Sequence, residues 1–106
     1  MDKLFVVVRA DLPPSQQAVQ AVHAARQFAA EHQEAELKWF KTSNHLALLA
    51  VSSEEDILRL AALAGDRDIQ LSVFREPDLN DSVTAIALGP KAKAICRDIP
   101  LALGGR

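Results

Sequence analysis

Cysteine, glycine and aromatic residues are scarce in this chain, and each scarcity excludes something. The single cysteine, Cys96, cannot form an internal disulfide, so a reducing, cytoplasmic setting is the simplest inference. One cysteine cannot complete a zinc site, and the three histidines are not spaced as metal ligands, so we expect no metal. The four glycines form no phosphate-binding loop, and we expect no cofactor. Aromatic residues are only 5% of the chain, which favours a core of small and branched side chains.

Long apolar runs and a basic charge excess are also missing. No run approaches the ~20 apolar residues that cross a bilayer, so we expect no membrane association. The first nine residues lack the pattern of a signal peptide. The formal net charge is -2, so any nucleic-acid binding must come from a local basic face. The length of 106 residues and the 25% of charged residues are typical of one globular domain, spanning 1–106.

Four segments have the apolar patterns of β-strands. Lys3–Arg9 (KLFVVVR) and His45–Val51 (HLALLAV) are continuous apolar runs, typical of strands buried on both faces. Ile69–Arg75 and Val83–Leu88 are predicted as the third and fourth strands. A polar loop of about seven residues joins these two, which favours either a hairpin or an extended connection.

Helices are predicted between these strands and after the last one. The first spans residues 15–32, and the second follows a capping box that begins at Ser52 or Ser53. Gly65 is predicted as the left-handed C-terminal cap of the second helix. A short helix is expected over residues 90–98. The predicted apolar face of the first helix consists of Ala18, Val19, Val22, Ala25, Phe28 and Ala29.

The resulting order of elements, β-α-β-α-β-β-α, predicts an α/β fold. Helical crossovers after the first two strands imply parallel pairing. We therefore expect a mixed four-stranded sheet with helices on both faces. The polar stretch over residues 31–38 is expected to end the first helix or to turn beyond it, and residues 100–106 are expected to fray.

Two segments resemble the type-2 peptidyl-tRNA hydrolases. VVVRADLPPSQQAVQAVHAA, over residues 6–25, has that family's apolar strand, Arg, Asp-Leu and a helix with Gln-x-x-His-Ala. LSVFREPDLNDSVTAIALGP, over residues 71–90, has its strand with an acidic end, its loop, and a strand that begins with Thr and closes in Gly-Pro. With the helix between them, the resemblance covers nearly the whole chain.

The chain also departs from the family pattern. Gln16 falls where the family has a lysine that is implicated in activity. Glu76 stands where the family has aspartate, and the loop that follows is shorter. Short bacterial and phage-like relatives share the Arg-Glu-Pro-Asp-Leu wording of this loop.

The resemblance implies a hydrolase that cleaves the ester between a peptide and the tRNA 3′ ribose, with water as the nucleophile. It implies four catalytic residues. Glu76 and His23 would orient or deprotonate the water, while Gln20, Thr84 and backbone N–H groups would bind the oxyanion. The alternative for Gln20 and His23 is a structural role at the helix–sheet contact, and the alternative for Glu76 is a solvated acidic turn.

Substrate-binding residues are predicted at the ends of the strands. Arg9 and Arg75 could hold phosphates if they point to one rim; salt bridges to Asp11 or Glu76 are the alternative. Asp78 shares the acidic turn, with either a functional or a structural role. Trp39, Lys41, Ser43 and Asn44 could form an edge for the terminal adenosine of tRNA, although Trp39 could instead pack against the helix.

Two other functions fit the same fold. One is a catalytically silent module that binds tRNA or protein or has a regulatory role. The missing lysine and the acidic net charge favour this alternative. The other is an enzyme that acts on a small molecule. The expected partner is the tRNA 3′ end, and the resemblance also implies a homodimer.

Overall fold

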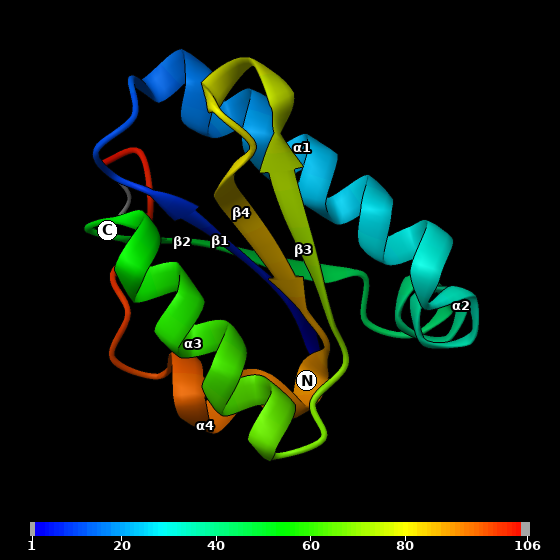
Figure 1. Cartoon of the computed structure of the whole chain (residues 1–106). Coiled ribbons are helices and arrows are strands. Elements are labelled where there is room, and N and C mark those ends of the chain that lie inside the picture. The colour runs from blue at the N-terminus through cyan, green and yellow to red at the C-terminus, as the bar shows by residue number, and fades with distance from the viewer. Residues whose placement is uncertain (1, 105–106) are drawn as a thin grey trace.

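The computed structural model describes residues 2–104 and contains one four-stranded sheet between two layers of helices (Figure 1). Two short 3-10 turns precede β4 and α4. In chain order the elements are β1 (Lys3–Arg9), α1 (Pro14–Glu31), α2 (Gln33–Lys41), β2 (His45–Val51), α3 (Glu54–Asp66), β3 (Leu71–Glu76), a 3-10 turn (Pro77–Leu79), β4 (Ser82–Leu88), a 3-10 turn (Pro90–Ala92) and α4 (Lys93–Cys96).

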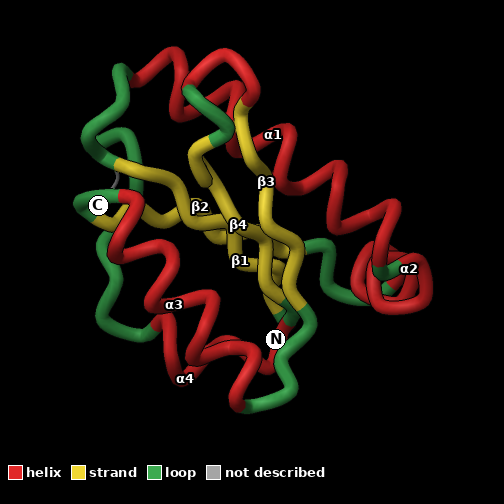
Figure 2. The backbone as a smooth tube through the Cα atoms, in the orientation of Figure 1, coloured by secondary structure: helices red, strands yellow, loops and turns green. Residues whose placement is uncertain are grey.

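The strands lie in the order β2-β1-β4-β3. β1 runs parallel to β2, whereas β4 runs antiparallel to both β1 and β3. The tube in Figure 2 shows β1 and β4 in the centre of the sheet. The predicted α/β fold with a mixed four-stranded sheet is therefore confirmed, and the third and fourth strands form a hairpin.

Each face of the sheet has its own apolar core, because side chains alternate along the strands. On β1, Leu4, Val6 and Val8 pack with Ala24 and Phe28 of α1. The remaining positions of β1 face α3 and α4. That second core contains Phe5, Val7, Leu49, Ile57, Leu60, Ala64, Val83, Ile86, Leu88 and Cys96. Helices therefore cover both faces, as predicted.

The buried face of α1 differs from the prediction. Val19 and Val22 are 49% and 59% exposed. The helix is instead rotated so that its sheet-facing side includes two glutamines, and the buried positions are Gln17, Gln20, Ala21, Ala24 and Phe28. The pattern of apolar residues missed this face because it does not count glutamines. A buried amide is stable where it finds hydrogen-bond partners, and Gln17 donates to Leu12 O at 2.7 Å.

The first helix ends at Glu31, as expected, but residues 33–41 then form a separate helix, α2, that the sequence did not indicate. Two other local expectations are wrong. Gly65 lies inside α3, and the left-handed residue after that helix is Asp68, with a φ of 55°. Leu101 pairs with Leu49 at the outer edge of β2, where Ala50 and Ala102 donate backbone hydrogen bonds across the pair, so this part of the tail is ordered. The last two residues of the segment that was expected to fray lie outside the described range.

Candidate active site

Gln20 is the centre of a buried polar cluster between α1 and the β3–β4 hairpin. Its Oε1 accepts from the Thr84 hydroxyl at 2.6 Å. Its Nε2 donates to Glu76 Oε1 at 2.9 Å and to Gln16 Oε1 at 3.2 Å. The structure therefore brings together three of the four residues predicted as catalytic, from three different elements.

A β-bulge directs Thr84 toward this cluster. Phe74 pairs with Ala85 but Arg75 pairs with Val83, so Thr84 is an extra residue on β4. Ala85 belongs to the core on the α1 side, and Thr84 bonds to α1 as well. Two consecutive residues thus face α1, which regular alternation along a strand does not allow.

The hydrogen-bond pattern determines how the Gln20 amide is oriented. A carboxylate only accepts hydrogen bonds, so the amide nitrogen must face Glu76 and the oxygen is left for the Thr84 hydroxyl. Both N–H groups of Gln20 and the Thr84 proton are thereby engaged. Gln20 and Thr84 are also 0% exposed. They have no free donor for an oxyanion, and this differs from the role expected from the sequence.

Of the three clustered residues that were predicted as catalytic, Glu76 is the one that reaches the surface. It is the last residue of β3 and is partly buried, whereas Gln20 and Thr84 are fully covered. Its Oε1 is held by Gln20, and within residues 2–104 its Oε2 accepts no hydrogen bond. Glu76 therefore presents one anchored and one free carboxylate oxygen.

His23 lies beside the cluster without a hydrogen bond to it. Its ring stacks on Phe74, with centroids 4.5 Å apart and an interplanar angle of 10°. His23 is exposed on α1, while Phe74 of β3 packs into the core on the α1 side. The stack places His23 along the ridge between α1 and β3, next to Gln20 and Glu76.

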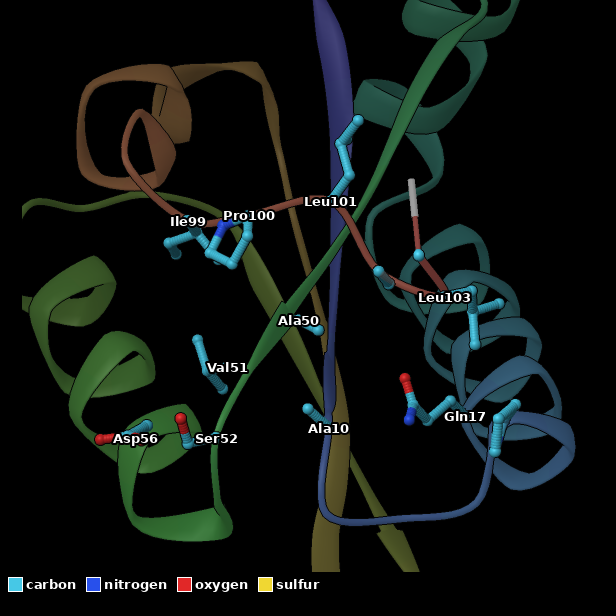
Figure 3. A pocket seen from close by; sticks show the side chains of 13 residues that line it. Ala10, Gln17, Ala50, Val51, Ser52, Asp56, Ile99, Pro100, Leu101 and Leu103 are labelled. Atoms are coloured by element: carbon cyan, nitrogen blue, oxygen red, sulfur yellow. The ribbon is translucent and has the colours of Figure 1, made fainter. Parts of the chain in front are cut away.

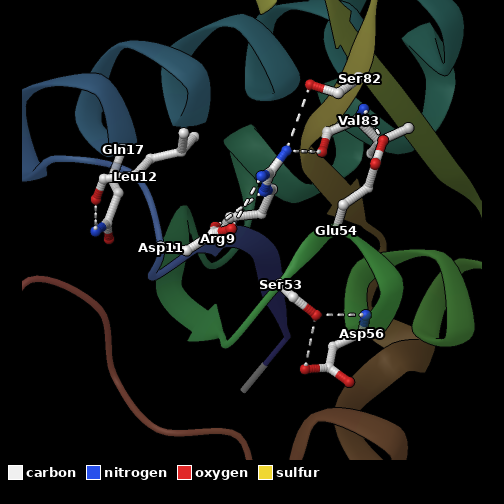
Figure 4. A network of polar contacts seen from close by, with 9 residues as sticks. All are labelled: Arg9, Asp11, Leu12, Gln17, Ser53, Glu54, Asp56, Ser82 and Val83. Atoms are coloured by element: carbon white, nitrogen blue, oxygen red, sulfur yellow. Dashed lines mark hydrogen bonds and ion pairs between the residues drawn. The ribbon is translucent and has the colours of Figure 1, made fainter.

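Arg9 lies on the opposite face of the sheet, in a network at the ends of β1 and β4 (Figure 4). Its Nε and Nη2 donate to the two carboxylate oxygens of Asp11, each at 3.0 Å, and its Nη1 approaches Ser82 Oγ and Val83 O at 3.4 Å. The hydrogen bond from Arg9 holds the pKa of Asp11 below its ordinary value, and the same bond raises the pKa of Arg9. The salt bridge considered as an alternative for Arg9 is thus present.

Arg75 shares a shallow pocket with Arg9. The strands β1 and β3 are not neighbours, because β4 separates them. The two arginines nevertheless line one open pocket of about 550 Å³ at the same end of the sheet, together with Glu54 and Asp81. Arg75 Nη1 donates to the backbone O of Asp81 at 3.3 Å. The two guanidinium groups therefore share a rim that also contains carboxylates.

Lys41 and Asn44 lie at the other end of the sheet. Asn44 directly precedes β2, whose first residue pairs with Lys3 at the start of β1, whereas the Gln20 cluster lies beyond the end of β1. Seven strand residues separate these ends by roughly 20 Å. Trp39, their predicted neighbour, packs against the core, and its Nε1 donates to His45 O at 2.7 Å.

A larger pocket of about 720 Å³ contains none of the predicted site residues. It lies at the carboxyl ends of β1 and β2, beneath the C-terminal segment (Figure 3). Its walls are mainly apolar and include Ala50, Val51, Pro100, Leu101 and Leu103. Asp56 is the one acidic side chain in its lining, and it bonds to Ser53 and Arg59 instead.

The described residues add neither a metal-binding cluster nor a reactive cysteine to the site, and they include no membrane-spanning helix. Within residues 2–104, no cluster of three or more His, Cys, Asp or Glu side chains is arranged to hold a metal ion. Cys96 is buried among the side chains of α3 and α4, and burial raises its pKa to about 11. In the described part of the chain, no helix is both long and apolar enough to cross a membrane.

Sequence patterns missed two residues that complete the site. Phe74 was assigned only to a strand, although its ring supports His23. Gln16 was noted only for replacing a lysine, yet it accepts from the Gln20 amide. The four-residue spacing of Gln16 and Gln20 on one helix was the available signal. Asp78, in the 3-10 turn after Glu76, is exposed.

Two sequence comparisons with known proteins agree on one family, and a structural comparison shows a similar fold. A family model described as "Peptidyl-tRNA hydrolase PTH2" matches residues 2–103. The chain is 31% identical over 98 residues to a peptidyl-tRNA hydrolase from Staphylothermus marinus, with 83% of this chain and 81% of that protein covered. A solved structure from Agrobacterium, of a protein of unknown function, superposes with a TM-score of 0.67 at 16% identity, covering 93% of this chain and 96% of the other. At that identity, the likeness is one of fold.

Proposed function

The chain belongs to the peptidyl-tRNA hydrolase PTH2 family, and we propose that Glu76 activates the water that cleaves the ester between the peptide and the tRNA 3′ ribose. The anchored carboxylate of Glu76 carries this proposal. Gln20 fixes one of its oxygens, and the free oxygen is the group available to a water molecule.

The proposed reaction is a general-base hydrolysis. Glu76 accepts a proton from water as the water oxygen bonds to the carbonyl carbon of the ester. The tetrahedral intermediate then expels the 3′ oxygen of the ribose, which takes up the proton that Glu76 accepted, and the peptide leaves with a free carboxyl group. A base held in one position lowers the free-energy barrier of this step, because the carboxylate has little orientational freedom left to lose in the transition state.

Gln20 and Thr84 are positioning residues in this proposal. Both are fully buried, so an ester outside α1 does not reach them. Thr84 holds the Gln20 amide, and Gln20 holds Glu76, so the bulge on β4 indirectly sets where the base lies. This replaces the oxyanion role that the sequence suggested for the two residues.

Basic side chains would bind the tRNA backbone. Arg75 is exposed and directly precedes Glu76 on β3, with its side chain on the opposite face of the sheet. Arg9 is neutralised by Asp11, so we propose that Arg75 is the stronger phosphate ligand. Asp78, beside Glu76, would contact the bound 3′ end or its water. Lys41 and Asn44 lie too far away for the same nucleotide, so their proposed contact is with a more distant part of the tRNA.

A homodimer remains part of the proposal. Leu37 and Phe40 on α2 and Leu46 on β2 are 53%, 58% and 58% exposed, respectively. Apolar side chains of this size on one end of a small domain support burial against a second copy. Sedimentation at micromolar concentration tests this, and a strictly monomeric species would contradict it.

The function is tested by measuring release of peptide from peptidyl-tRNA. Glu76→Gln keeps an acceptor oxygen but removes the base, so it is expected to lower kcat by about 100-fold or more. Asp66→Asn, an exposed change at the end of α3, is the matched control and should leave kcat unchanged. If the unmodified protein binds peptidyl-tRNA without releasing peptide, the hydrolase proposal fails and the silent binding module is favoured.

A further inference from the structure

The outer face of the His23 ring is the feature that the hydrolytic mechanism leaves unused. One face of the ring stacks almost parallel on Phe74, at a centroid distance of 4.5 Å. Phe74 is anchored in the core on the α1 side, while His23 is exposed on the ridge above it. The pair is therefore a flat aromatic surface that is supported by Phe74 on one side and exposed at His23 on the other.

His32 shows how a structural histidine looks in the same molecule. It lies one turn beyond Phe28, with its ring tilted by 38°, and its Nε2 lies 2.9 Å from the backbone O of Leu71 on the outer edge of β3. That hydrogen bond covers an otherwise open carbonyl of an edge strand. His23 makes no side-chain hydrogen bond to any residue in the range 2–104. Hydrogen bonding of its ring nitrogens therefore does not explain why the ring lies on Phe74.

The position of the stack relates it to the proposed base. Phe74 and Glu76 are two residues apart on β3 and face the same side of the sheet, which separates them by roughly 7 Å. His23 is likewise three residues from Gln20 on α1, so the two lie on adjacent turns. A ring stacked on His23 would therefore lie on the same side of the sheet as Glu76 and close to it along β3.

We propose that the His23 ring, backed by Phe74, is the platform on which the 3′-terminal nucleobase of the tRNA stacks while its ribose ester lies at Glu76. The proposal rests on the proposed function for the identity of the ligand. Unpaired bases at RNA ends are commonly bound on aromatic rings, including histidine, because each base offers a π face. Trp39, the earlier candidate for this base, is at the opposite end of the sheet with its indole already packed.

The platform is tested first by binding, with chemistry switched off. A tRNA minihelix carries the fluorescent base 2-aminopurine at its 3′ end, and all proteins carry Glu76→Gln so that no ester or product chemistry interferes. Stacking quenches this fluorophore, so the parent protein should quench it on binding. Adding His23→Ala should remove the quench and weaken binding roughly 5- to 100-fold, the loss expected for one stacked base.

Two further variants separate stacking from other effects. His23→Phe retains a flat ring, so it should restore both quench and affinity. Val22→Ala shortens the neighbouring side chain, which is 59% exposed, and should leave both unchanged. Equal quenching by the parent and by His23→Ala, or no quenching by the parent, would overturn the platform.

Kinetics then distinguish a platform from a proton-transfer role for His23. In the protein with Glu76 intact, His23→Ala should raise KM by a similar factor at nearly constant kcat, and His23→Phe should rescue it. A substrate whose terminal nucleotide lacks the base should make the His23→Ala effect vanish. A fall in kcat that Phe does not rescue would instead assign His23 to proton transfer. If the unmodified protein releases peptide normally but His23→Ala quenches the fluorophore like the parent, the platform alone is refuted. If the quench depends on His23 but the unmodified protein releases no peptide, only the hydrolase proposal is refuted.

Discussion

Replacing Thr84 with valine should destabilise the protein by about 1–3 kcal/mol, because it leaves the Gln20 amide oxygen buried without a donor. Valine has nearly the shape of threonine, so the change creates no cavity. The lost contact is the 2.6 Å hydrogen bond from Thr84 Oγ1, and both residues are 0% exposed. Water cannot substitute for the hydroxyl at such a site without an opening of α1.

Urea unfolding measures this effect. A chain of this size has a total unfolding free energy of about 5–15 kcal/mol, so the loss is a sizeable fraction. With a slope of about 1–3 kcal/mol per M urea, the midpoint should fall by roughly 1 M at unchanged slope. Thr42→Val removes an exposed hydroxyl that bonds to Lys38 O, and it should cost less than about 0.5 kcal/mol.

A double-mutant cycle isolates the contact between the two side chains. Gln20→Leu with Thr84→Val removes both partners, and it should cost less than the sum of the single changes by about 1 kcal/mol or more. In the two proteins that carry Gln20→Leu, Glu76 loses its anchor, and a fall of about 10- to 100-fold in kcat is expected. The fall should be smaller in Thr84→Val, where Gln20 can still donate to Glu76 but is no longer held by the hydroxyl. Additive single effects, or a Thr84→Val protein as stable as the parent, would refute the hydrogen-bonded cluster.

Three further predictions follow from the same structure. Glu76→Asp should retain a general base but draw it back from Gln20 by one methylene, giving a kcat between those of the parent and Glu76→Gln in the peptide-release assay. Cys96, whose pKa burial raises to about 11, should react with a thiol reagent at pH 8 about 100-fold more slowly in the folded protein than in urea; equal rates would contradict its burial. The pKa of Asp11 is lowered in the folded state by Arg9, so its stabilising contribution is present above the unfolded pKa of about 3.9 and is lost as pH falls below it. Asp11→Asn should therefore reduce the difference between urea midpoints at pH 6 and pH 3, and an unchanged difference would contradict this linkage.

The strands could be predicted because each is rich in apolar residues, continuous in β1 and β2, and is bounded by polar or turn residues. β1 and β2 match the predicted ranges, and β4 begins only one residue early. Such a run buries enough side-chain area on both faces of a sheet to decide its own structure. The two crossover helices then implied parallel pairing, and the parallel pair is β1 with β2.

The orientation of α1 could not be predicted in the same way. Periodicity assigned Val19 and Val22 to the core, yet both are largely exposed, while Gln17 and Gln20 face the sheet. A glutamine is stable inside only if its amide finds partners, and those partners come from distant parts of the chain. Gln20 depends on Thr84, which is 64 residues away in sequence.

For the candidate site too, local sequence motifs identified some residues, and contacts between distant segments determined how they are arranged. Family motifs in the sequence singled out Gln20, His23, Glu76 and Thr84, and their catalytic roles remain predictions. Nothing local indicated that the bulge would direct Thr84 inward, that Phe74 would support His23, or that Lys41 and Asn44 would lie at the opposite end of the sheet. Strand order and register determine all three, because they fix which ends of the elements meet.

By itself, the sequence determined the four strands, the helices apart from α2, the α/β class and the family, since these depend on local apolar patterns and on motifs in fixed order. Only the tertiary structure decided which side chains are buried and which donors are engaged. Burial and hydrogen bonding are properties of contacts between distant segments, and so the division between a surface base, Glu76, and its buried supports, Gln20 and Thr84, arises only when α1 packs on the sheet.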